Sequence, residues 1–158
     1  MRLALDTFGH VTLARRGDAL VTDSRLAPTC PRPPLHVHPG QSEHFEVRAG
    51  RLRLTVGARD LVLAQGDAVT VPAGTPHTFA VDGGEPVDLR ATFHPAGRLE
   101  GFFHGLHALA RDGHIDDRGR PRSLAVARFA LEHLDEFRLA KAPARLQRIA
   151  LLALARAA

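Results

Sequence analysis

Hydrophobic and polar residues alternate along much of the first 96 residues, in short runs that turn-forming residues separate. An alternation with a period of two is typical of strands that bury one face. From Leu35 to Phe93 the runs recur between the turn signals Pro39-Gly40, Gly50, Gly57, Gly66, Pro72-Ala73-Gly74 and Asp82-Gly83-Gly84. Short strands at this spacing predict a β-sandwich or barrel. The looser alternation of residues 1–26 predicts one to three outer strands.

After Pro95 the hydrophobic spacing changes to the period of an amphipathic helix. The first predicted helix ends at Asp112-Gly113 and has the apolar stripe Leu99, Phe102, Phe103, Leu106, Leu109 and Ala110. A second is expected to be capped by Ser123, with the stripe Ala127, Ala130, Leu131, Leu134 and Phe137. Pro143 suits the first position of a third. Because these stripes are too apolar for a free linker, the tail is expected to pack on the barrel or on a second copy of it.

The length and composition favour one modest domain with a helical extension. A chain of 158 residues with 44% hydrophobic content fits a single core. We predict the barrel over residues 1–96, with its motif core at residues 34–81, and the extension over residues 97–158. The single cysteine, Cys30, excludes an internal disulfide and favours a reducing compartment.

Hydropathy argues against a membrane role, and the charge permits nucleic-acid binding without indicating it. No stretch approaches the ~20 apolar residues that span a bilayer, and Asp6 and Gly9 interrupt the first apolar residues before a signal-peptide core could form. A cytoplasmic protein is therefore expected. The chain has 21 basic and 17 acidic residues, but its arginines are scattered, so nucleic-acid binding is not indicated.

Three histidines and one glutamate lie at spacings that could bring their side chains together. In a strand, His36 and His38 point to the same side, because side chains alternate between faces. A Pro-Gly turn would let Glu43 fold back against them, and a second tight turn would deliver His77 from another strand. This ligand set suits a divalent first-row transition metal, whereas calcium and magnesium take mainly oxygen ligands.

These residues resemble the two sequence motifs of the cupins, small β-barrel proteins also called jelly rolls or double-stranded β-helices. The first motif has two histidines one residue apart, then a glutamate and a glycine, and is matched by His36, His38, Glu43 and Gly50. The second has a glycine, a Pro-x-Gly turn and a histidine, and is matched by Gly66, Pro72, Gly74 and His77. The resemblance covers roughly residues 20–96. It departs from the family at Val81, where an asparagine that is not a metal ligand often stands.

The resemblance implies a mainly β fold, a cupin-type jelly-roll barrel ahead of the C-terminal α-helical tail. It also implies one divalent ion (Fe, Mn, Ni, Cu or Zn) held by His36, His38, Glu43 and His77. About two coordination positions would stay open for water, oxygen or substrate. We therefore expect a metal-binding cupin with dioxygenase- or isomerase-type chemistry on a small organic molecule. The alternative is a small-ligand-binding or sensor cupin without turnover, and a helix-turn-helix regulator is not favoured by the tail.

Further histidines and polar residues have less specific interpretations. His44 is expected on the opposite strand face from the site. The helical spacing of His104 and His107, with His114 beyond, would suit a second metal site, but no acidic or cysteine residue accompanies them, which favours boundary positions. The residues available as a general acid or base, if they face the pocket, are Asp67, Arg53, Arg90 and His94.

The apolar helical tail must be shielded from water, and this leads to two expectations. Phe102 and Phe103 could line the barrel mouth as a lid, or could simply pack in the core. Because edge strands and an apolar helical stripe both need cover, we also predict a homodimer.

Overall fold

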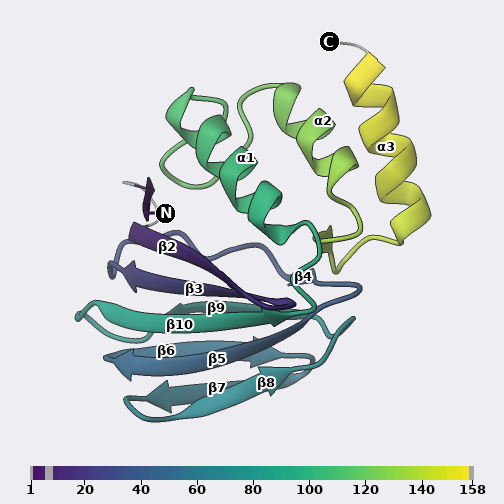
Figure 1. The fold of residues 1–158 in the computed structure, drawn as a ribbon. Helices are drawn as coiled ribbons and strands as arrows, with labels where there is room; N and C mark the ends of the chain where they lie inside the picture. Colours follow the sequence, from purple (N-terminus) through teal and green to yellow (C-terminus); the bar gives the residue numbers. More distant parts are fainter. Residues whose placement is uncertain (1, 6–8, 157–158) are drawn as a thin grey trace.

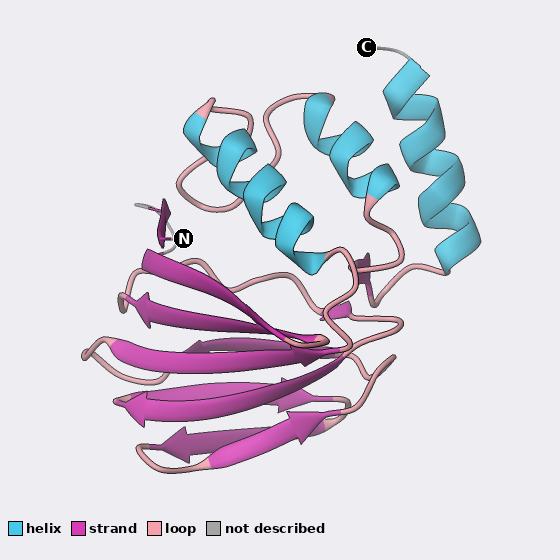
Figure 2. Ribbon diagram, viewed as in Figure 1, coloured by secondary structure: helices cyan, strands magenta, loops and turns pink. Residues whose placement is uncertain are grey.

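The computed structural model describes residues 2–5 and 9–156 and confirms the predicted combination of a β-barrel with a helical tail (Figure 1). The strands form two antiparallel sheets, and the helices gather together beside one side of them (Figure 2). Within these described ranges, no helix is long and apolar enough to cross a membrane.

The first sheet, as far as the structure describes it, has six strands in the order β1-β2-β3-β10-β5-β8. Their bounds are β1 (Arg2–Leu5), β2 (Gly9–Arg16), β3 (Ala19–Leu26), β10 (Val87–His94), β5 (Ser42–Ala49) and β8 (Ala68–Val71). The outer strands predicted for residues 1–26 are therefore β1 to β3. Strand β10 joins them to the motif strands, because Ala91 lies opposite Thr22 on one side and opposite Phe45 on the other.

The second sheet has five strands among the described residues, in the order β11-β4-β9-β6-β7. Their bounds are β11 (Arg138–Leu139), β4 (His36–Val37), β9 (His77–Val81), β6 (Arg51–Val56) and β7 (Arg59–Ala64). Strand β11 comes from the C-terminal extension and pairs with β4. The extension thus supplies a strand to the second sheet, although the predicted division at residue 96 assigned it helices alone.

Alternation along the strands fills the space between the two sheets. In β5 the side chains of Glu43, Phe45 and Val47 are buried, whereas His44 lies on the other face and contacts the hydroxyl of Thr70 at 2.8 Å. The main hydrophobic cluster consists of Leu26, Phe45, Val47, Leu52, Leu54, Leu63, Val71, Val87 and Leu89. The period of two read from the sequence therefore places Glu43 inside the barrel.

The helices are α1 (Leu99–Arg111), α2 (Ala125–Glu132) and α3 (Ala144–Arg156), and α1 packs on the outer strands of the first sheet. Its residues Leu99 and Phe102 join a second cluster with Val11, Leu13, Leu20, Ala91, Phe93 and Ala96. Phe103 is partly buried and packs against this cluster. Helix α1 therefore fixes the extension to the barrel.

The sequence interpretation of the second helix is wrong at both ends. Ser123 does not cap it, because the helix begins at Ala125 without a side-chain cap and the Ser123 hydroxyl instead contacts Nδ1 of His114 at 2.9 Å. At the other end α2 stops at Glu132, and Phe137, predicted on its stripe, lies beyond it. There the chain turns toward the barrel, where the aromatic ring is covered by other rings.

Helix α3 begins one residue after Pro143 and leaves much of its apolar surface uncovered. The side chains of Leu146 and Ile149 are 58% and 63% exposed, and Leu152 and Leu154 are exposed beside them. A second chain could cover this face, and the homodimer stays a prediction.

Gly50, the last residue of the first motif, occupies a position that suits only glycine. Its φ of +80° lies in the left-handed region, and an added Cβ would stand 2.5 Å from the carbonyl oxygen of Pro86. Gly66 also has a positive φ, of +91°, but an added Cβ there would meet nothing within 4 Å. A side chain at either position would strain the backbone, but only at Gly50 would it also overlap with a neighbouring atom.

We expect Gly50→Ala to destabilise the protein more than Gly66→Ala. The left-handed conformation should cost each variant about 1–2 kcal/mol of unfolding free energy, and Gly50→Ala adds the overlap with Pro86. Urea unfolding of both variants measures the difference. Equal losses of stability would show that the close approach at Gly50 carries no energetic weight.

Candidate metal centre

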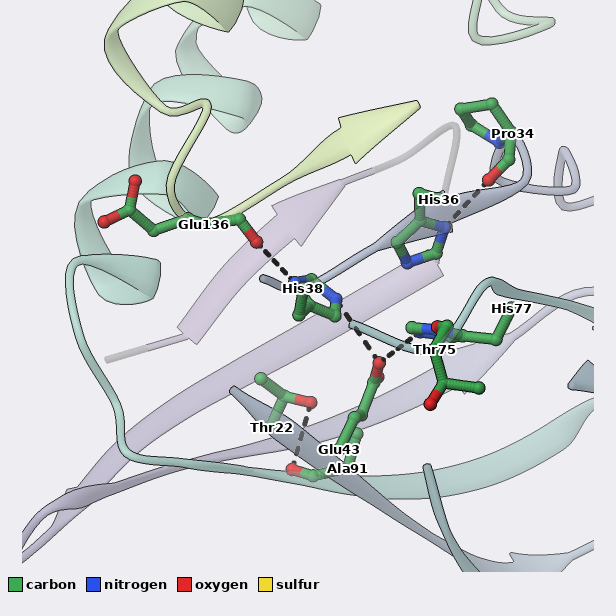
Figure 3. A network of polar contacts seen from close by, with 9 residues as sticks. All are labelled: Thr22, Pro34, His36, His38, Glu43, Thr75, His77, Ala91 and Glu136. Carbon is green, nitrogen blue, oxygen red and sulfur yellow. Dashed lines mark hydrogen bonds and ion pairs between the residues drawn. The ribbon is translucent and has the colours of Figure 1, made fainter. Parts of the chain in front are cut away.

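Four side chains from both sheets converge inside the barrel (Figure 3). His36 in β4 and His77 in β9 are direct cross-strand neighbours in the second sheet. His38 follows β4 immediately, and Glu43 comes from the facing sheet through β5. The two turns that precede Glu43 and His77 thus bring the residues together as the sequence predicted.

The four residues, which we call the candidate metal centre, are closely spaced and almost completely buried. One possible ligand atom from each lies within 4.8 Å of all the others, and none of the residues is more than 5% exposed. Oε2 of Glu43 lies 2.8 Å from Nε2 of His77 and 3.4 Å from Nε2 of His38. The ring centroids of His36 and His77 are 4.3 Å apart.

Backbone carbonyl groups fix all three imidazole rings from behind. Nδ1 of His36 donates to the carbonyl oxygen of Pro34 at 2.8 Å, and Nδ1 of His77 donates to that of Thr75 at 2.9 Å. Nδ1 of His38 donates to the carbonyl oxygen of residue 136, in the segment after α2 (Figure 3). A carbonyl oxygen only accepts, so each Nδ1 carries the proton and each Nε2 is available as a ligand atom.

The electrostatics of the candidate metal centre keep one carboxylate charged in the protein interior. Burial lowers the pKa of His36 to about 3, and the neighbouring imidazoles add to this effect. Burial also opposes the charge of Glu43, but its contacts with the imidazoles of His38 and His77 outweigh this effect and hold its pKa at about 2. Although burial disfavours its cation, the contact with Glu43 raises the pKa of His77. The carboxylate of Glu43 thus favours the protonated form of His77.

This donor set fits a divalent transition metal. Three Nε2 atoms and one carboxylate oxygen are of the types that bind such ions, and the Nδ1–carbonyl hydrogen bonds are the usual support of ligating histidines. A metal cation at the centre would lie against the same carboxylate and would neutralise its charge. The buried cluster is thus compatible with a divalent metal ion.

The extension contributes contacts that the sequence interpretation missed. The ring of Phe137 stacks on the imidazole of His36, with centroids 4.6 Å apart and planes 18° apart. Phe102 and Phe103, the proposed lid residues, make ring contacts with each other, and among the described residues neither makes one with the four residues of the centre. Phe102 stacks on Phe137 instead. The spacing of Phe137 in the sequence is that of an ordinary apolar helix position. Its contact with the candidate metal centre is therefore visible only in the tertiary structure.

The other polar residues considered from the sequence lie elsewhere. Arg53 pairs with Asp82 and Arg90 with Asp23. Asp67 accepts a hydrogen bond from the backbone of Ala64, and His94 is exposed. Within the described residues, His104, His107 and His114 belong to no cluster of three or more possible metal ligands. His44 is likewise outside the site, as predicted.

Gln41 is a buried polar residue that the sequence interpretation did not consider. It stands two residues before Glu43, it is 6% exposed, and its Oε1 has no hydrogen-bond partner among the described residues. Its Nε2 lies close to the backbone of Gly97, at the start of the extension. The sequence did offer a signal for its burial: Gln41 lies two residues before Glu43, and residues two apart in an extended chain point to the same face.

The fold and the buried cluster define a double-stranded β-helix protein with a site between its sheets. Comparison with protein families matches residues 23–93 to the cupin domain family. Residues 23–93 therefore form a cupin domain, as the two motifs implied.

Solved structures agree on the fold. The TT1209 protein of Thermus thermophilus is similar with a TM-score of 0.53 and 24% identity, over 61% of this chain and 90% of that one. KdgF of a Halomonas species has a TM-score of 0.54 and 13% identity, over 63% of this chain and 90% of that one. Among curated proteins, quercetin 2,3-dioxygenase of Bacillus subtilis is 44% identical over 46 residues. That match spans 29% of this chain and only 14% of the dioxygenase.

The lowered pKa of His36 predicts how stability of the metal-free protein depends on pH. The unfolded chain protonates this residue near pH 6.5, whereas the folded protein keeps it neutral down to about pH 3. Between these values the unfolded state binds more protons, so stability falls as the pH falls, by up to about 1.4 kcal/mol per pH unit. The raised pKa of His77 acts oppositely, with its stabilisation full below pH 6.5 and lost as the pH rises.

We expect His36→Asn to flatten this dependence between pH 6.5 and 4.5, above the range in which Glu43 begins to lose its own contribution. Urea unfolding of the metal-free proteins at several pH values measures the slope. The slope is compared because the substitution also removes a ring contact and so changes absolute stability. Parallel slopes for the variant and the natural protein would contradict the assignment.

Proposed function

We propose that this chain is a metal-binding cupin that holds one divalent transition-metal ion through His36, His38, Glu43 and His77. The observation that supports this most directly is the set of three Nδ1–carbonyl hydrogen bonds, which leave three Nε2 atoms facing one carboxylate. One histidine would be enough to form an ion pair with Glu43. Three imidazoles held in place around the same carboxylate are better explained as ligands of a metal ion. Zinc, iron, manganese, nickel and copper all suit such a donor set.

We further propose that the centre acts on a small organic molecule by dioxygenase- or isomerase-type chemistry. When bound, the ion would polarise an oxygen of the substrate or exchange electrons with it. The chain itself would supply orientation through the fixed imidazoles, and a charged Glu43 that lowers the net charge at the ion. The likeness to quercetin 2,3-dioxygenase supports the oxygenase branch over the matched 46 residues.

The second candidate function is binding of a small ligand without turnover, as in a sensor. Its support is the enclosure of the centre, whose four residues are buried with Phe137 stacked over His36. Two surface clefts, of about 640 and 490 Å³, are lined by other residues. A substrate would therefore need these rings to move before it reached the ion, whereas a resident ion would not.

Metal analysis tests the proposed ligands. Protein reconstituted with zinc or iron and then dialysed should retain about one ion per chain, because four converging donors bind far more tightly than scattered surface residues. The double variant His36→Ala with His77→Ala should lose it. The control His44→Ala, altered on the opposite strand face, should retain it. A stoichiometry near zero in the natural protein, or one that the double variant preserves, would contradict the metal site.

Turnover distinguishes the two candidate functions. We expect the metal-loaded protein to consume dioxygen, or to isomerise its substrate, when supplied with flavonols, catechols or enediols, and to lose this activity in His36→Ala. An oxygen electrode and product analysis measure the reaction, beside a thermal-shift screen of the same compounds. A compound that raises the melting temperature of the metal-loaded protein but is never converted would favour the sensor.

A further inference from the structure

The two-residue strand β4 depends on the C-terminal extension for its place in the second sheet. Its pairing with β9 is a single residue pair, His36 with His77. On its other side it makes two pairs with β11, Arg138 with Val37 and Leu139 with His36. The N–H of Ala140 adds a hydrogen bond to the carbonyl oxygen of Leu35 at 2.9 Å. In the described structure, the extension thus gives this strand more backbone pairing than the barrel does.

The same part of the extension orients two of the three imidazoles. Phe137 stacks on His36, and the carbonyl group of Glu136 accepts the hydrogen bond from His38. Phe137 is held in turn by Phe102 of α1, with ring centroids 5.4 Å apart and planes 17° apart. We call residues 134–139 the latch segment. Its position and the positions of these imidazoles are therefore mutually dependent.

Gln147 connects the latch segment to α3. Its Oε1 accepts a hydrogen bond from the backbone N–H of Leu139 at 3.0 Å, and its Nε2 donates to the carbonyl oxygens of Leu139 at 2.7 Å and Ala142 at 2.6 Å. Because Leu139 is the cross-strand partner of His36, a continuous series of direct contacts runs from the candidate metal centre to α3. Helix α3 is the element with the exposed apolar face.

We propose that the latch segment is a working part of the metal centre, so that metal binding and the docking of the latch segment and α3 stabilise each other. This inference rests on the proposed function, since it requires the ion to bind. Coupling of this kind is reciprocal: if docking raises the affinity for the ion by some factor, the ion favours docking by the same factor. Phe137 is then a positioning residue that acts through His36, and Gln147 one that acts through β11. Metal occupancy would thereby set how firmly the apolar face of α3 is held.

Matched substitutions test the effect on metal affinity. Phe137→Ala should weaken zinc binding by at least roughly tenfold, the usual scale for residues that support metal ligands. Gln147→Ala should weaken it in the same direction. The control Phe129→Ala removes a ring that stacks on Phe102 in the same helical unit without a contact to the candidate metal centre, and should stay near the natural affinity. Gln65→Ala, in the turn after β7, is the control for Gln147. Competition with a chromophoric chelator measures each affinity.

The spectrum of cobalt-loaded protein separates ligand positioning from general loss of stability. Phe137→Ala should shift the visible absorption bands, because the imidazole of His36 is free to turn, whereas Phe129→Ala should leave them unchanged. Unchanged spectra together with unchanged affinities in Phe137→Ala and Gln147→Ala would overturn the inference.

Hydrogen exchange of the natural protein tests the reciprocal effect and needs no variant. Added zinc should slow exchange at the amides of Leu139 and Ala140 and in α3, while the hairpin of β2 and β3, which carries no ligand, serves as a reference with no expected change. Zinc that binds with the expected stoichiometry yet leaves these amides unaffected would contradict the latch alone. Failure of the natural protein to bind any metal would contradict the proposed function, and the latch with it.

Discussion

The buried carboxylate of Glu43, facing three imidazoles, is the interaction on which the rest of the structure depends. A charge in the protein interior is tolerated only when it is paired and hydrogen-bonded, and loss of one partner of a buried pair costs about 3–5 kcal/mol. Glu43 comes from one sheet and His36 and His77 from the other, so its neutralisation requires both sheets to close around it. The same closure packs the hydrophobic cluster beneath the site, with Phe45 next to Glu43 on the inward face of β5.

The extension helps to enclose the candidate metal centre, because Phe137 lies against His36. The ring of Phe93 lies 5.3 Å from that of His38, and the ring of Phe137 stacks on that of His36. A low-dielectric surrounding strengthens interactions with an ion but also hinders the approach of a substrate. Because Phe137 belongs to a segment tied to β4 and α3, any opening of the site involves the extension as well. The two proposed functions, turnover and sensing, would therefore place the same demand on this segment, and they differ in whether a substrate passes it.

Most of the barrel could be predicted from local patterns, and the extension only in part. Strand alternation placed Glu43 inward, and the motif glycine Gly50 marks a turn whose positive φ the structure confirms. The periodicity of the tail gave three helices, but the second was extended to Phe137 because periodicity cannot show where a helix is outcompeted by tertiary contact. The ring contacts of Phe137 with Phe102 and His36 outweigh its continuation of the helix.

The sequence by itself determined the mainly β architecture, the two cupin motifs and the identity of the four residues that meet between the sheets. These follow from alternation, turn chemistry and side-chain type, all of which are local properties. Only the tertiary structure decided that the extension returns as β11, that the carbonyl group of Glu136 orients His38, and that Phe137 stacks on His36. Such contacts join residues about one hundred positions apart. They are made by backbone carbonyl groups and aromatic rings, which occur at many positions, so the local sequence does not show which of them will meet.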